Sequence, residues 1–503
     1  MKRYLIIETC PCSPHIETSI EIALNLKKKN NKVFFFWCGF DLLFSEWTPV
    51  DKNMQYNQFT VKIFYESRIK KVQDYLASQG IEIIPKLNLS NIQYNYINHK
   101  VKLFNNYKKL KFFKYENKSL VGLAAYSSLA SKYHTLNIND YKDLIEPAIK
   151  TSCIIFERSN KIIQDINPDV VVTFNGRFAT SRPIIDAAKF NKKNFLIHER
   201  GSSLKAYEIF KNEIHNNDYI YKEVNRYWNK QKNYEKKIKI AKKYFLLLEN
   251  KKFIERLGLN FEKKTTNHIF FNKNKKIITY LCSTDYEYFF VGLDLKKYFI
   301  NNYWSNQINT LKSIIKIIKN DTDVVLYIKS HPNFSPRNDQ EIRLKELETS
   351  NVIYLSVDNK QDTLELIRSS HLIFSFGTSL EIYAAYLNKK VISFAKSFYT
   401  KFNFIIYPKN EAHLKKLIYK KNEKKLIYKK LNLYKVAYYL MTFGINFQNY
   451  KSTGFSKGYL KKIRIDRYEF LVPLKIIYLI YVLKNFLLEV FIIILRLFKF
   501  NIK

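Results

Sequence analysis

The sequence predicts a two-domain α/β protein built on parallel sheets, and three observations lead to this fold class. Short apolar runs alternate with longer amphipathic stretches, which is typical of strand–helix–strand units. Most of these runs end in a polar loop, as buried strands do at a ligand-binding edge. The length of 503 residues exceeds what one hydrophobic core serves, so we expect more than one domain.

Seven apolar runs are expected to be strands, and they fall into two groups. The first group is Tyr4–Glu8, Lys32–Trp37, Val170–Phe174 and Asn194–His198, with a helical pattern over Ile16–Lys29. The second group is Ile277–Cys282, Val324–Lys329 and Leu372–Phe376. A basic, helical-looking stretch from Glu223 to Arg256 separates them. We therefore predict one domain at about 1–255, a second at about 265–410, and a cleft between their strand ends.

Six of these strands run into loops rich in hydroxyl, histidine, arginine or carboxylate side chains. In open α/β sheets, ligands bind outside the carboxyl ends of the strands, so these loops predict the binding sites. The alternative is ordinary surface loops with capping serine and threonine residues.

The composition narrows the class of protein and its surroundings. The net charge is +41, but 47% of the residues are apolar, which excludes a disordered basic tail. The abundance of Lys, Asn and Ile fits an AT-rich coding sequence, so the charge alone argues weakly for nucleic acid; a membrane surface, anionic sugars or phosphates fit equally well. Five cysteines without a C-x-x-C pair indicate a reducing compartment and no metal site. Only four apolar residues precede Glu8, too few for a signal peptide, so we expect a cytoplasmic protein.

Phosphate binding has to use helix N-termini and side chains, because the 11 glycines form neither G-x-G nor a P-loop motif. Gly377, Thr378 and Ser379 lie where a strand ends and a helix begins, which suits a phosphate. Glu381 could accept hydrogen bonds from ribose hydroxyls, although an ordinary capping box explains it as well. His331 follows another strand and could donate to the same phosphate; a structural histidine is the alternative.

The first domain carries an arginine-rich set of loop residues. Asn175, Arg177, Arg182, Glu199 and Arg200 follow two neighbouring strands, and arginine clusters recognise carboxylate or phosphate groups. A general base must be a histidine or carboxylate near the acceptor hydroxyl. The candidates are His15, Glu17 and Glu199, which the sequence alone does not rank.

The tail from 409 to 503 carries 21 Lys+Arg and 5 Asp+Glu, so it contributes +16 of the net charge. It contains the segment KKLIYKK twice, at Lys415–Lys421 and Lys424–Lys430. Phe470–Phe500 is mostly apolar but is interrupted by charges, too often for a membrane-spanning helix. We predict that 411–503 is a basic helical tail lying on an anionic membrane surface, a helix packed on the protein or a partner being the alternative.

These motifs together resemble the bacterial capsule and surface-polysaccharide biosynthesis proteins with a GT-B glycosyltransferase fold. The resemblance covers about 150–395 and depends on the following residues: Phe174–Arg177, Arg182, His198–Gly201, His215, Ser283–Glu287, Trp304, Gln307, His331–Asn333, Gly377–Ser379 and Glu381. The histidine–proline and threonine–serine pairs are also similar to those of bacterial sialyltransferases and Kdo transferases. An acidic catalytic motif of those sialyltransferases has no match here.

The resemblance implies two Rossmann-like domains and a glycosyltransferase. Because the sequence has no convincing set of metal ligands, we expect the enzyme to act without a metal or cofactor. The resemblance places the nucleotide of a donor sugar, perhaps CMP-linked, on His331, Thr378 and Ser379. We expect Ser283, Gly377 and Glu381 at the same donor site, and Asn175 and the three arginines at an anionic glycan or glycolipid acceptor. The expected location is the inner face of the cytoplasmic membrane. Alternatives are a nucleotide-sugar epimerase, a polyol-phosphate transferase and a non-catalytic capsule assembly protein. A nucleic-acid binder is disfavoured because the polar residues gather at strand ends, not on an exposed sheet face.

Overall fold

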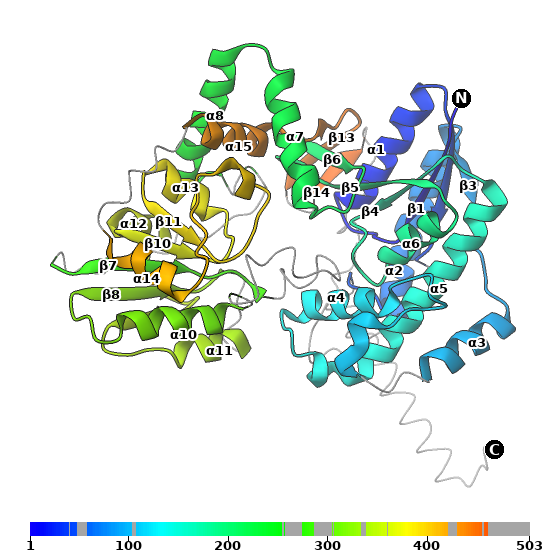
Figure 1. Ribbon diagram of the computed structural model, residues 1–503. Helices are drawn as coiled ribbons and strands as arrows, with labels where there is room; N and C mark the ends of the chain where they lie inside the picture. Colours follow the sequence, from blue (N-terminus) through cyan, green and yellow to red (C-terminus); the bar gives the residue numbers. More distant parts are fainter. Residues whose placement is uncertain are drawn as a thin grey trace, which may run out of the picture.

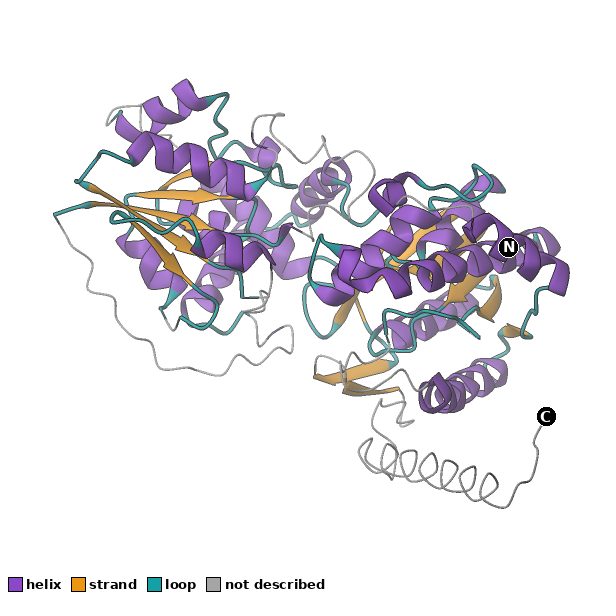
Figure 2. Cartoon of the chain, turned by 90° about the horizontal axis from the view of Figure 1, so that it is seen from below, coloured by secondary structure: helices purple, strands orange, loops and turns teal. Residues whose placement is uncertain are grey.

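The computed structural model describes residues 1–39, 41–47, 58–102, 107–253, 256, 274–285, 304, 306–332, 339–359, 361–420, 430–454 and 457–460. These residues form two α/β bodies, each with helices on both sides of a sheet (Figures 1 and 2). The predicted fold class is therefore confirmed: two Rossmann-like domains in a GT-B-like chain. The cleft expected between them stays a prediction.

The first sheet has seven strands in the order β12-β6-β5-β4-β1-β2-β3. Its strands from the first part of the chain are β1 (Arg3–Glu8), β2 (Lys32–Trp37), β3 (Glu82–Ile84), β4 (Val170–Phe174), β5 (Asn194–Arg200) and β6 (Ala206–Phe210). β1 to β5 are parallel, and β6 turns back antiparallel to β5.

Alternation along the strands explains how both faces of this sheet are covered. Leu5 and Ile7 face one core and Ile6 the other, because successive side chains of a strand point to opposite faces. The helices on the first face are α3 (Asn91–Lys102), α4 (Val121–Tyr133), α5 (Lys142–Ile166) and α6 (Arg182–Phe190). Those on the second are α1 (His15–Lys28) and α2 (Gln58–Ser78).

The second sheet is fully parallel, in the order β11-β10-β7-β8-β9. Its strands are β7 (Lys276–Leu281), β8 (Val324–Lys329), β9 (Val352–Leu355), β10 (Leu372–Ser375) and β11 (Lys390–Ser393). Its helices are α10 (Gln307–Ile318), α11 (Asp339–Lys345), α12 (Thr363–Ser369), α13 (Leu380–Tyr386) and α14 (Glu411–Tyr419). The spatial order is the same as that of β1 to β5 in the first sheet: β11-β10-β7-β8-β9 corresponds strand by strand to β5-β4-β1-β2-β3.

Helices α7 (Asn217–Lys230) and α8 (Tyr234–Glu249) follow the first sheet in the chain but pack in the second body. Their buried residues share a core with α12, α13 and α15 (Lys430–Thr442), for example Trp228 with Tyr438. Figure 1 shows α7 and α8 beside α15. The last strand that the first half of the chain gives to the first sheet, β6, ends at Phe210, and α7 and α8 then join the core of the second body.

The chain then returns to the first sheet. β12 (Ile445–Asn446) pairs with β6, and a hairpin of β13 (Tyr450–Gly454) and β14 (Lys457–Leu460) packs beside α1. The fully buried Glu21 on α1 accepts hydrogen bonds from the backbone N–H groups of Gln448 and Asn449, both at 2.8 Å. The part of the predicted tail described up to Leu460 is therefore integrated into both bodies.

The predicted membrane-surface helix Phe470–Phe500 lies outside the described residues, as does the second KKLIYKK copy up to Lys429. Within the described part of the chain, every helix is too short or too polar to cross a bilayer.

Candidate active site

Both sheets have a switch point, where the chain connections leave adjacent strands in opposite directions. In the first sheet it lies between β1 and β4, and in the second between β7 and β10. Ligands of open α/β sheets bind outside the carboxyl ends of the strands at such points. The predicted site residues of both domains follow these strands or their neighbours.

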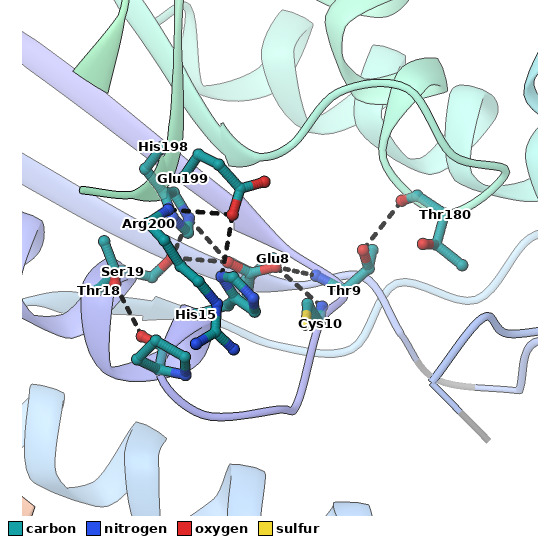
Figure 3. Close-up of polar contacts among 11 residues, drawn as sticks. Glu8, Thr9, Cys10, His15, Thr18, Ser19, Thr180, His198, Glu199 and Arg200 are labelled. Atoms are coloured by element: carbon teal, nitrogen blue, oxygen red, sulfur yellow. Dashed lines mark hydrogen bonds and ion pairs between the residues drawn. The ribbon is translucent and has the colours of Figure 1, made fainter. Parts of the chain in front are cut away.

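His15 is the first residue of α1, directly after the loop that follows β1. Its ring centroid lies 3.9 Å from that of Phe174 at the end of β4, and its Nδ1 lies 3.8 Å from Glu199 Oε1 (Figure 3). Burial lowers the pKa of His15 well below 6.5, and the charges of Arg200 and His198 lower it further. His15 is thus neutral at pH 7, so one of its ring nitrogens carries no proton.

Glu199 is held in place by its neighbours at the end of β5. Asn175 Nδ2 donates to Glu199 Oε2 at 2.8 Å, and the backbone N–H of Arg200 donates to Oε1 at 3.0 Å. The structure therefore brings together four of the predicted residues: His15, Asn175, Glu199 and Arg200. A histidine backed by an oriented carboxylate is the arrangement of a general base.

The hydrogen bonds of Glu17 are made with Arg68 and Ser13. Its Oε1 accepts hydrogen bonds from Arg68 Nη2 at 2.7 Å and Ser13 Oγ at 2.6 Å, and its side chain is 1% exposed. Burial raises the pKa of Glu17 against the opposing effect of Arg68. Glu17 thus forms a buried ion pair with Arg68 that joins α1 to α2.

The three predicted arginines each have different partners. Arg182 lies 3.8 Å from Asp186 and 3.6 Å from Glu213, whereas Arg177 lies 3.4 Å from His215 and over the Phe178 ring. Burial and the Arg177 charge lower the pKa of His215 to about 3. Arg200 alone adjoins the His15–Glu199 pair.

At the second switch point, Gly377 has φ +77°, a left-handed conformation that favours glycine. Glu381 is fully buried beneath this turn, where its Oε1 accepts from Gly377 N at 2.9 Å, from Ser393 Oγ at 2.7 Å and from Ser375 Oγ. Burial raises its pKa to about 7, with the serine hydroxyls opposing the rise. Glu381 therefore supports the turn from below.

Hydroxyl groups line this edge. Thr378 Oγ1, after β10, and Thr284 Oγ1, after the adjacent β7, are buried and have no hydrogen-bond partner among the described residues. Ser379 is exposed, and His331 is half-buried one residue after Ser330 at the end of β8. The structure thus brings Thr378 to the same edge as Ser283 and Thr284.

Ser283 is fixed by glutamine side chains. Its N–H donates to Gln307 Oε1 at 2.8 Å, and Gln307 Nε2 donates to Asp285 Oδ1 at 2.6 Å. Gln340 Oε1 accepts from Asp285 N at 3.0 Å. Burial raises the pKa of Asp285 to about 6. Asp285 and Thr284 were not predicted as site residues, although both belong to the motif at Ser283–Glu287.

Other residues at these edges were not predicted at all. Glu8, Ser19 and Arg68 are buried and polar. Of these three, only Glu8 has a recognisable sequence pattern, because it is a carboxylate at the end of an apolar strand. Among the residues that the structure describes, no group of histidine, cysteine and carboxylate side chains could hold a metal ion.

No family model matches the chain, and no curated protein does. Among solved structures it is similar to the β-Kdo 2,7-transferase of KpsC from Thermosulfurimonas dismutans, at 12% identity over 61% of this chain and 86% of that one, with a TM-score of 0.35. It is also similar to a putative UDP-N-acetylglucosamine 2-epimerase from Listeria monocytogenes, at 11% identity over 89% of this chain and 93% of that one, with a TM-score of 0.28.

A third similar structure is the UDP-GlcNAc 2-epimerase from Methanocaldococcus jannaschii in complex with UDP-GlcNAc and UDP. It is 16% identical over 87% of this chain and 98% of that one, with a TM-score of 0.29. At these levels of similarity, none of the matches assigns an activity to this chain.

Proposed function

We propose that this chain is a glycosyltransferase that moves a sugar from a nucleotide-sugar donor to a growing capsule or surface polysaccharide. One observation carries the proposal: both sheets have a switch point, and at each lie buried polar atoms that have no hydrogen-bond partner among the residues the structure describes. In the first sheet these atoms include His15 Nδ1 and Asn175 Oδ1, and in the second Thr284 Oγ1 and Thr378 Oγ1. Two separate sites of this kind suit a reaction between two bound substrates.

The donor nucleotide is assigned to the second sheet. The hydroxyls of Thr284 and Thr378 lie on adjacent strands and could donate to phosphate oxygens, and the left-handed Gly377 lets the backbone approach the ligand closely. His331 stands one strand away and would offset the charge of the leaving phosphate. Ser283 and Ser379 belong to the same site. Since Glu381 lies beneath Gly377, its role there is to support the turn.

The acceptor is assigned to the first sheet, with His15 as base. The acceptor hydroxyl would give its proton to His15 as its oxygen bonds to the sugar carbon and the bond from that carbon to the nucleotide phosphate breaks. Glu199, oriented by Asn175, would stabilise the resulting imidazolium. Arg200 adjoins this pair and suits an anionic acceptor.

The finer assignments follow the sequence analysis. We propose a CMP-linked acidic sugar as donor, a glycan or glycolipid acceptor, and attachment to the inner membrane surface through the tail beyond Leu460. Deleting residues 461–503 is expected to release the protein from anionic liposomes in a sedimentation assay. Retention of the shortened chain on such liposomes would refute the attachment.

Nucleotide binding tests the donor site. A thermal-shift series with CMP, UDP, GDP and CDP is expected to stabilise the full-length protein with at least one nucleotide. Thr378→Val should weaken the binding of that nucleotide by about 10- to 100-fold, because a hydrogen bond to a charged group is worth about 1.5–3 kcal/mol. Thr310→Val is the matched control, since the Thr310 hydroxyl already donates to Asn306 O at 2.8 Å. Equal loss in both variants would contradict the assignment.

Asp285 favours one alternative, a nucleotide-sugar epimerase. A carboxyl group with a pKa of about 6 at the nucleotide edge could move a proton on the donor sugar itself. An epimerase would convert the donor without any acceptor, whereas the transferase needs the first sheet's site. Conversion of a nucleotide-sugar that survives His15→Gln but not Asp285→Asn would identify the epimerase.

A further inference from the structure

Glu8 lies at the centre of the contacts in Figure 3, although the proposed reaction assigns it no role. It ends β1 and is completely buried, and so are Ser19 on α1 and His198 on β5. A buried carboxylate is costly unless hydrogen bonds compensate for its lost hydration, so its partners indicate what it does.

Three donors face the two oxygens of Glu8, together with the ring nitrogen Nε2 of His198, which also lies 2.9 Å from Ser19 Oγ. The backbone N–H groups of Thr9 and Cys10 each donate to Oε1 at 2.8 Å. Ser19 Oγ donates to Oε2 at 2.6 Å, and His198 Nε2 lies 3.2 Å from the same oxygen. An ionised carboxylate accepts at both oxygens, so it matches this set of donors, whereas an amide would present N–H groups to part of it.

These partners belong to the segments that carry the proposed base. Thr9 and Cys10 begin the loop that leads to His15. Ser19 lies four residues after His15, so the two share one face of α1. His198 immediately precedes Glu199 on β5.

The contacts also close into a ring. His198 O accepts from the backbone N–H of Asn175 at 3.2 Å, and Asn175 Nδ2 donates to Glu199 Oε2 at 2.8 Å. Glu199 faces His15, whose helix returns to Glu8 through Ser19. Each member thus contacts or directly neighbours the next, from Glu8 through His198, Asn175, Glu199 and His15 back to Ser19.

We infer that Glu8 is a positioning residue that holds His15 and Glu199 in place across the edge of the first sheet. This rests on the proposed function, in which these two residues form the base. Glu8 acts through the loop after β1, through Ser19 and through His198.

Glu8→Gln tests the inference, because glutamine has the same size as glutamate. If its amide oxygen keeps the hydrogen bonds from Thr9 and Cys10, its N–H group points toward Ser19 and His198, where the carboxylate had an oxygen. Transfer is expected to slow about 10- to 100-fold at an unchanged donor KM, the effect of a small misplacement of reacting groups. NMR of histidine-labelled protein gives a second readout without substrate. His15, assigned with His15→Gln, should titrate closer to 6.5 in Glu8→Gln than in the wild type, because a loosened ring regains hydration.

Glu21→Gln is the matched control. Glu21 is as buried as Glu8, lies on the same helix as His15 and Ser19, and also accepts two backbone N–H groups, but those belong to Gln448 and Asn449. It should lose stability and keep the wild-type titration of His15. If Glu8→Gln does not fold, Ser19→Ala removes one donor and should shift the His15 titration in the same direction.

A Glu8→Gln protein whose His15 titration matches that of Glu21→Gln would overturn the inference. The NMR result decides this even if no transfer is detected with the wild type, which would instead count against the proposed function.

Discussion

Replacing His15 by glutamine is expected to lower the transfer rate by about 10²–10⁴-fold, the usual contribution of a general base. Glutamine preserves a polar side chain of similar length but cannot accept the proton of the acceptor hydroxyl. Nucleotide binding should persist, because the donor site belongs to the other sheet. Transfer rates and nucleotide thermal shifts of the same preparation measure both.

His413→Gln serves as the control for this variant. His413 lies on α14 in the second body, where its Nδ1 accepts only from the backbone N–H of Lys409 in the bonds described. It should retain the wild-type rate. If His15→Gln transferred sugar at the wild-type rate as well, His15 would not be the base, and Glu199 would become the leading candidate.

Because of Glu381, the free energy of unfolding is expected to fall as the pH rises. Its pKa is raised from 4.5 to about 7 in the folded protein, so between these values the folded state holds a proton that the unfolded state has lost. The stabilisation is fully present below pH 4.5 and is lost as the pH rises through about 7. The shift corresponds to a loss on the order of 3 kcal/mol in the free energy of unfolding.

Glu381→Gln should remove this component, because an amide oxygen can still accept from Gly377 and the two serines without ionising. Urea unfolding at pH 5 and pH 8 measures it. The variant is expected to gain stability over the wild type at pH 8 and not at pH 5. An equal difference at both pH values would show that the charge of Glu381 does not set the pH dependence.

The strands could be predicted well because a buried parallel strand is a continuous apolar run. Lys32–Trp37, Val170–Phe174 and Val324–Lys329 begin and end where expected. Short edge strands such as β3 and the two-residue β12 carry no such pattern. The return of the chain to the first sheet depends on Glu21 meeting Gln448 and Asn449, a pairing that spacing cannot reveal.

The types of residue at the site could be predicted better than which of these residues lie together. The strand order brings His15, Asn175 and Glu199 together, as their positions after neighbouring strands suggested. Two of the three predicted arginines have partners that the sequence did not suggest: Arg182 lies near Asp186 and Glu213, and Arg177 near His215. Their role at an acceptor site stays a prediction. Arg68 was missed because it lies within a helix, and its contacts with Glu17 and Ser13 join segments far apart in the sequence.

Nucleotide release from nucleotide-sugars tests the central claim most directly. The full-length protein is incubated with CMP-, UDP- and GDP-linked sugars, with and without oligosaccharide acceptors, and free nucleotide is measured. The proposed function predicts acceptor-dependent release from at least one donor. This release should fall about 10²–10⁴-fold in His15→Gln, which still binds the donor, and should need a higher donor concentration in Thr378→Val. Release that does not depend on an acceptor, or no binding of any nucleotide, would contradict it.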